Sequence, residues 1–110
     1  MNHEPPVARR QVEVLNTLGL HLRPALKFVE LALKYQAEVR VHYNGNDFNG
    51  KSILELTSLA AEFGTCLELE ARGPDAREAV EALADLVRAR FHLTENGESS
   101  DDQQGGGLPS

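Results

Sequence analysis

The hydrophobic period of this chain changes repeatedly between two residues and the period of a helix, and this change limits the fold more than any other feature. Segments in which apolar and polar residues alternate predict half-buried strands. In RQVEVLN, for example, Val12 and Val14 fall on one side of the chain. An NGND turn separates two such segments, as in a hairpin. The predicted strands cover residues 10–16, 37–43, 47–49 and 65–71.

Two further segments have the spacing of amphipathic helices. The first helix is predicted from Leu22 to Lys34, and its apolar residues recur at i, i+3, i+4 and i+7: Ala25, Phe28, Val29 and Ala32. The second helix is SILELTSLAAEFG, in which Ser52 is the predicted N-cap and Glu55 completes a capping-box pattern. Gly64 is the predicted end of this helix.

A third helix is predicted within residues 73–91, with Asp75 as its cap. Its buried stripe comprises Ala76, Val80, Leu83 and Val87. The element order is therefore β-α-β-β-α-β-α. Half-polar strands favour an antiparallel sheet with one solvated face, and three helices with one apolar stripe each can cover the other face. We predict an α+β, two-layer sandwich.

Composition bounds the chain to one small domain. The 110 residues carry a net charge of −6, of which residues 94–110 supply −4 and the remainder −2. Nothing resembles the basic stripe that binds nucleic acid, and no apolar run approaches the ~20 residues of a membrane span. One cysteine and no signal-peptide pattern favour a cytoplasmic protein. We expect tails at residues 1–8 and 94–110 and a domain at 9–93.

The stretch GLHLRP places a histidine, His21, at a predicted helix start. The first-turn amides of such a helix lack internal partners and favour negative charge, so Gly19, Leu20, Leu22 and Pro24 form the backbone of a candidate anion site. Gly19 can take the backbone conformation that turns the strand into the helix. Arg23 adds a guanidinium suited to an oxyanion. This arrangement suits an imidazole that carries a phosphoryl group. The alternative is an ordinary polar residue at a helix start.

LGLHLRPA resembles the active-site signature of the HPr family, the histidine-containing phosphocarriers of the bacterial phosphotransferase system, and GKSILELTSL resembles its second signature. The resemblance implies an open-faced β-sandwich with a four-stranded antiparallel sheet and three helices on one face. It implies that His21 accepts a phosphoryl group on Nδ1 from enzyme I, which phosphoenolpyruvate phosphorylates, and passes it to an EIIA protein or domain. Arg23 would balance the phosphoryl charge. We expect a monomeric carrier without cofactors, not an enzyme.

Ser52 matches the family's regulatory serine, which an ATP-dependent kinase/phosphorylase modifies in many members. Helix capping alone also explains this serine. Leu18 and Ala60 stand where some members have Asn and Gly. Glu30 and Glu55 add acidity, which hints at a nitrogen-type or purely regulatory partner set.

A carrier must present an apolar docking surface. We expect Ile53 and Leu54 to lie partly exposed beside His21, surrounded by three basic residues: Arg23, Lys27 and Lys51. Leu56 and Leu59 are expected in the core. The histidines have no metal-ligand spacing, and Cys66 is expected in the strand core. Two alternatives to the carrier remain: a regulatory HPr-like binding module controlled through Ser52, and an unrelated α+β interaction domain.

Overall fold

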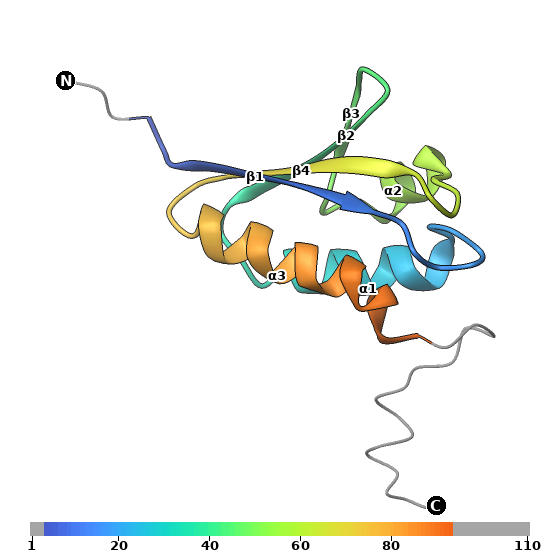
Figure 1. Ribbon diagram of the computed structural model, residues 1–110. Helices are drawn as coiled ribbons and strands as arrows, with labels where there is room; N and C mark the ends of the chain where they lie inside the picture. The colour runs from blue at the N-terminus through green and yellow to red at the C-terminus, as the bar shows by residue number, and fades with distance from the viewer. Residues whose placement is uncertain (1–3, 94–110) are drawn as a thin grey trace, which may run out of the picture.

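The computed structural model describes residues 4–93, which form a four-stranded antiparallel sheet in the order β1-β4-β2-β3 (Figure 1). The strands are β1 (Val7–Glu13), β2 (Glu38–Tyr43), β3 (Asn46–Asn49) and β4 (Cys66–Arg72). The helices are α1 (Leu22–Ala32), α2 (Ile53–Leu59) and α3 (Ala76–Arg88), and a short 3-10 turn, η1 (Arg90–His92), follows. The predicted element order and the open-faced α+β sandwich are confirmed.

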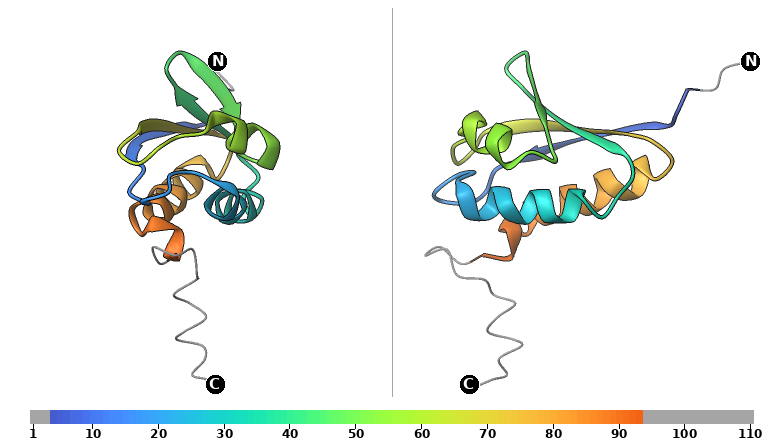
Figure 2. Two further views of the ribbon diagram at one scale, coloured as in Figure 1. Left: turned by 90° about the vertical axis from the view of Figure 1, so that its right-hand side faces the viewer. Right: turned by 180° about the vertical axis from the view of Figure 1, so that it is seen from behind.

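The helices lie on one side of the sheet. Figures 1 and 2 show α1 and α3 side by side and antiparallel beneath it, so that α3 ends where α1 begins. The shorter α2 lies over the first turns of α1 and contacts both α1 and β3. This packing brings the ends of three elements, α1, α2 and α3, to one end of the molecule.

The core lies between the sheet and the helices, as expected from strands and helices that each have one apolar side. Alternate strand residues face inward and are buried, among them Val39, Val41, Leu67, Leu69 and Ala71. The predicted stripe of α3 is confirmed, because Ala76, Val80, Leu83 and Val87 are each at most 1% exposed. An amphipathic helix such as α3 buries its apolar face by packing it against the sheet.

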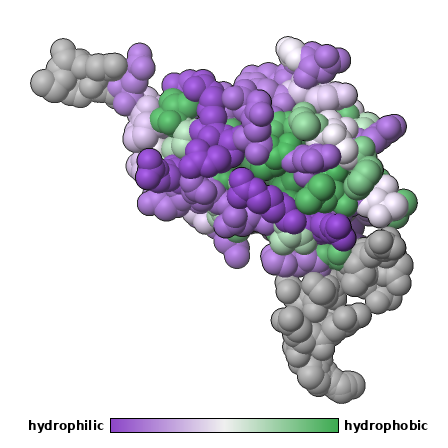
Figure 3. Space-filling view, in the orientation of Figure 1, coloured by the Kyte–Doolittle hydropathy of each residue, from purple (hydrophilic) through white to green (hydrophobic). Residues whose placement is uncertain are grey.

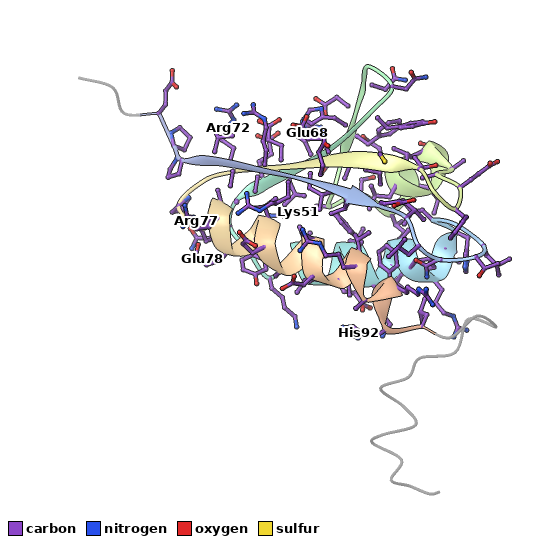
Figure 4. All side chains as sticks on the ribbon, viewed as in Figure 1. Lys51, Glu68, Arg72, Arg77, Glu78 and His92 are labelled. Carbon is purple, nitrogen blue, oxygen red and sulfur yellow. The ribbon has the colours of Figure 1, made fainter. Side chains whose placement is uncertain are left out.

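The other face of the sheet is polar and centres on Glu70, whose side chain is 12% exposed. Its carboxylate accepts from His42 Nε2 at 2.6 Å, from Arg72 at 3.3 Å and from Arg9 at 3.4 Å. Burial acts to raise the pKa of Glu70, but the hydrogen bond from His42 and the charges of Arg9, His42 and Arg72 hold this pKa below its ordinary value. Figure 4 shows Arg72 and Glu68 on this open face.

The sheet begins earlier than the alternation predicts. β1 starts at Val7, inside the expected tail of residues 1–8, because β4 extends to Arg72 and offers Val7 a ladder partner. β1 also ends at Glu13, and Val14 then donates to the carbonyl of Thr65 at 2.9 Å as the chain leaves the sheet. α1 ends at Ala32, two residues before the predicted Lys34.

The predicted end of α2 is wrong. The helix ends at Leu59, and its C-cap is Ala60, in the left-handed conformation (φ 54°), and not Gly64. Gly64 instead lies in the following loop and donates to the carbonyl of Val14 at 2.8 Å. Residues 60–64 of the predicted helix thus form a loop that is hydrogen-bonded to the strand end at Val14.

Two side-chain predictions are also wrong. Cys66 is exposed, because it belongs to the outward set of β4 while Leu67, Leu69 and Ala71 point inward. Asp75 stands at the N-cap position of α3, yet among residues 4–93 its carboxylate caps no helix amide. Its two oxygens accept instead from the backbone amides of Gln36 and Ala37, at 2.9 and 2.8 Å. Asp75 therefore ties the start of α3 to the chain entering β2.

Candidate functional site

The loop before α1 is held by backbone hydrogen bonds at both ends. Gly19 N donates to the carbonyl of Asn16 at 2.9 Å, which closes a tight turn, and Gly19 takes φ +76° there. Leu20, 5% exposed, donates to the carbonyl of Ala61 at 2.7 Å. The loop after α2 therefore supports the loop that leads into α1, and the predicted conformational role of Gly19 is confirmed.

His21 is the N-cap residue of α1, with extended backbone angles (φ −94°, ψ −164°). Its carbonyl accepts the first helical bond, from Ala25 N at 3.0 Å. Within the described residues its side chain makes no capping hydrogen bond to the helix amides, and the residue is half-exposed. Pro24 is buried in the first turn, where its missing N–H costs no hydrogen bond.

The first turns of α1 carry positive charge. Arg23 is exposed and Lys27 half-exposed, four residues apart and therefore on one side of the helix. The first turn contains no acidic residue. The helix N-terminus after His21 and the two cations on the first two turns together favour an anion at this end of the molecule.

Asn16 is a residue of this site that the sequence reasoning missed. Its side chain is 8% exposed, and its Nδ2 donates to the carbonyl of Arg90 at 3.1 Å. Its Oδ1 is buried with no hydrogen-bond partner among the described residues. A polar residue beside the Gly19 turn was the available signal, but the partner lies 74 positions away and only the tertiary structure reveals it.

Apolar side chains are exposed around the start of α1. The exposed fractions are 66% for Leu18, 63% for Leu22, 78% for Leu54 and 62% for Phe63. Figure 3 shows the apolar surface concentrated toward the end of the molecule where α1 begins, while the opposite end is mainly hydrophilic. Leu54 thus lies exposed as expected, on the helix that covers the first turns of α1.

The other members of the expected docking surface are arranged differently. Ile53 is half-buried and packs against the core, while Leu56 and Leu59 are buried as expected. Lys51 does not border this end of α1, because its Nζ donates to the carbonyl of Tyr35, beyond the C-terminal end of that helix, at 2.7 Å. The tertiary fold thus separates Lys51 from Arg23 and Lys27.

Ser52 is the N-cap of α2, as predicted. Its Oγ accepts from Glu55 N at 3.2 Å, and its own N–H donates to the carbonyl of Asn49 at 3.1 Å. Glu55 does not return a bond to Ser52 as a complete capping box would, because its carboxylate accepts from Asn49 N at 2.8 Å. The Ser52 hydroxyl is half-exposed.

Residues 4–93 contain no group of three His, Cys, Asp or Glu side chains that could hold a metal ion. In that same part of the chain, every helix is too short or too polar to cross a membrane. His3 and the predicted tail 94–110 lie outside the described residues.

Comparison with known proteins gives one consistent answer. Residues 8–89 match the family described as "PTS HPr component phosphorylation site". The phosphocarrier protein HPr of Neisseria meningitidis is 45% identical over 83 residues, which are 76% of this chain and 93% of that protein. The crystal structure of HPr-C-His from Thermoanaerobacter tengcongensis superposes with a TM-score of 0.76 at 36% identity, covering 79% of this chain and 98% of that one.

A third similar structure is that of Crh, the Bacillus subtilis catabolite repression HPr. It has a TM-score of 0.56 and 41% identity, and the match covers 73% of this chain and 95% of that one.

The fold and the site define a small open-faced β-sandwich protein that presents a histidine at the start of its first helix. The chain belongs to the HPr family of phosphocarrier proteins of the phosphotransferase system. His21, Arg23 and Ser52 fall within the matched residues.

Proposed function

We propose that this chain is a phosphoryl carrier that accepts a phosphoryl group on Nδ1 of His21 from phosphorylated enzyme I and passes it to an EIIA protein or domain, in the cytoplasm. In the first transfer an N–P bond forms at His21 while the donor's bond to phosphorus breaks. In the second transfer the N–P bond breaks and the acceptor takes the group, so the carrier is regenerated. The chain is consumed and restored as a substrate of its partners and is not a turnover catalyst.

The observation that carries this proposal is the position of His21. It is the half-exposed N-cap residue of α1 in a chain of the HPr family, with Arg23 two residues further on. An uncharged ring nitrogen attacks phosphorus, and the helix start and the guanidinium stabilise the charge that the histidine then carries. The exposed leucines nearby provide the apolar contact that a transient partner needs.

The test is phosphorylation of the full chain by purified enzyme I and labelled phosphoenolpyruvate, with His21→Ala and a matched histidine variant, His42→Gln, on the open face. We expect an acid-labile, base-stable label on the wild type and on His42→Gln, and none on His21→Ala. Arg23→Ala should slow the transfer about tenfold, the effect of losing one charge-assisted hydrogen bond in the transition state.

A labelled His21→Ala protein would contradict the proposal, since the phosphoryl group would then be elsewhere. An unlabelled wild type, under conditions in which the Neisseria relative is labelled, would contradict it as well.

We propose as a second function that phosphorylation of Ser52 regulates docking. The half-exposed hydroxyl precedes Leu54, the most exposed of the large apolar side chains near α1. A phosphate there adds nearly two negative charges beside this apolar surface and would oppose the approach of a partner. The similarity to the catabolite repression protein Crh keeps a purely regulatory role as the alternative to carrier activity.

This second function is tested with ATP and an HPr serine kinase/phosphorylase, with Ser52→Ala as the variant and Ser58→Ala as a matched control on the same helix. An acid-stable label on the wild type and on Ser58→Ala, absent from Ser52→Ala, would support it. Absence of label on the wild type would exclude it. Label on Ser52 with none on His21 would favour the regulatory module over the carrier.

A further inference from the structure

Asn16 is the one polar residue that is buried among residues 4–93, and the proposed transfer steps give it no role. Its Nδ2 donates to the carbonyl of Arg90 at 3.1 Å, and its own carbonyl accepts from Gly19 N at 2.9 Å. Gly19 is followed by Leu20 and then by His21. The side chain and the main chain of one residue therefore join the turn after α3 to the turn that precedes His21.

The turn that receives this hydrogen bond has a costly backbone conformation. Arg90, Phe91 and His92 have φ values of 55°, 59° and 58°, in the left-handed region that residues with a Cβ adopt at a cost. Three such residues in succession persist only where the surrounding structure holds them. Phe91 and Leu93 are buried, and the carbonyl of Arg90 accepts from Leu93 N at 3.1 Å as well as from Asn16. The Asn16 side chain is therefore one of the contacts that hold this turn.

This turn lies at the end of the molecule where α1 begins. η1 contacts α1, and Figure 4 shows His92 just beyond the last turn of α3. On the other side of the loop, Leu20 donates to the carbonyl of Ala61 at 2.7 Å. The loop that leads to His21 is thus held from two directions, by η1 through Asn16 and by the loop after α2 through Ala61.

Stability alone does not account for an amide at this position. The Oδ1 of Asn16 is buried without a hydrogen-bond partner in the described part of the chain. An unpartnered buried acceptor lowers stability, and the side chain offsets this loss with a single hydrogen bond. A leucine of similar volume would remove the unpartnered acceptor together with that hydrogen bond, so the two effects oppose each other. What the leucine cannot provide is the link between η1 and the loop before His21.

We propose that Asn16 is a positioning residue for phosphoryl transfer at His21. It fixes the turn at Gly19 against η1, and it thereby holds the imidazole in the orientation from which its ring nitrogen attacks phosphorus. This inference rests on the proposed function of His21. Because Asn16 is buried, it adds nothing to the surface that a partner contacts. Loss of its N–H donor therefore lowers kcat, which depends on the alignment of the reacting atoms, and leaves KM unchanged.

Transfer from phosphorylated enzyme I to the full chain tests this role with the Asn16→Leu variant. We expect kcat to fall about tenfold or more, while KM stays within about twofold of the wild-type value. A second variant, Asn16→Ala, lacks the same donor and adds no atoms to the core, so it should show the same fall. Urea unfolding of each variant measures the fraction that is folded at the assay temperature.

Asp75→Asn is the matched control, because Asp75 also links distant segments by hydrogen bonds. Its partners, the amides of Gln36 and Ala37, lie at the end of the molecule opposite His21. This variant should lower the free energy of unfolding and leave kcat unchanged. An equal fall in kcat for Asp75→Asn would show that any loss of stability slows transfer, and would overturn the positioning role.

The order of the loop provides a readout that does not depend on phosphoryl transfer. Order parameters from ¹⁵N relaxation should fall at Gly19, Leu20 and His21 in Asn16→Leu, and should stay at wild-type values in β2. Unchanged order parameters at these three residues would overturn the inference. So would an unchanged kcat, or a change confined to KM, in a variant whose wild type is phosphorylated. A wild type that enzyme I does not phosphorylate would instead overturn the proposed function, and the positioning role with it.

Discussion

Single residues at the candidate site are constrained by contacts from distant parts of the chain. Gly19 combines a positive φ with close packing, since a Cβ built there would lie 2.5 Å from the carbonyl oxygen of Ala61. Gly45 has a similar φ, +80°, but has nothing within 4 Å. Substitution of these two glycines therefore separates the effect of backbone strain on stability from the effect of a steric clash.

We predict that Gly19→Ala destabilises the protein by about 3 kcal/mol, from the left-handed backbone and the clash together, whereas Gly45→Ala costs about 1 kcal/mol from the backbone alone. Urea unfolding monitored by circular dichroism measures both values. Equal losses for the two variants would show that Ala61 moves aside at no cost.

Among the elements, the seven-residue helix α2 packs one face into the core and exposes the other to solvent. Leu56 and Leu59 are in the core, Ile53 packs at its margin, and Leu54 is 78% exposed. Leu33, at the far end of α1, is a matched exposed leucine at 61%. A docking surface around His21 should therefore include Leu54 and exclude Leu33.

We predict that Leu54→Glu raises the KM of enzyme I for this chain about tenfold, because an anchor at the centre of an interface carries a kcal/mol or more. Leu33→Glu should leave KM unchanged. Both variants should unfold within about 0.5 kcal/mol of the wild type, as exposed substitutions do. Equal KM values for Leu54→Glu and the wild type would place the docking surface elsewhere.

At the scale of the whole molecule, two carboxylates join elements that are distant in sequence. Asp75 accepts amide hydrogen bonds from Gln36 and Ala37, which lower its pKa, and the charge of Lys51 adds to this effect, although partial burial opposes it. The pKa of Glu70, between β4, β2 and β1, is lowered as well. Each group is therefore a stronger acid in the folded chain than in the unfolded chain.

We predict that the free energy of unfolding is constant above about pH 5 and falls as the pH drops below about 4, through the lowered folded pKa values. The free energy of unfolding falls because the carboxylates of the unfolded state take up protons at a higher pH than those of the folded state. The Asp75→Asn variant should have a lower free energy of unfolding than the wild type at pH 7. Its free energy of unfolding should also decrease less on acidification. Urea titrations between pH 7 and pH 2.5 measure both, and parallel curves for the two proteins would contradict the assignment to Asp75.

Features that depend on neighbours a few positions away can be predicted from the amino-acid sequence alone. These are the order of the elements, the stripe of α3, the Ser52 cap, the turn at Gly19 and the histidine at the start of α1. Hydrophobic period and capping are encoded within one or two turns of chain, so a single sequence is enough to find them.

The folded packing, in contrast, determines which distant groups meet. It joins Asn16 to Arg90 and Asp75 to Gln36, and it separates Lys51 from Arg23. It also ends α2 at Leu59, so that Ala61 can support the Gly19 loop. No local pattern specifies these partners, since a buried donor or acceptor takes whichever group the packing brings within about 3 Å. The sequence thus provides the histidine and its helix, and the packing of distant segments builds the surroundings in which that histidine is presented.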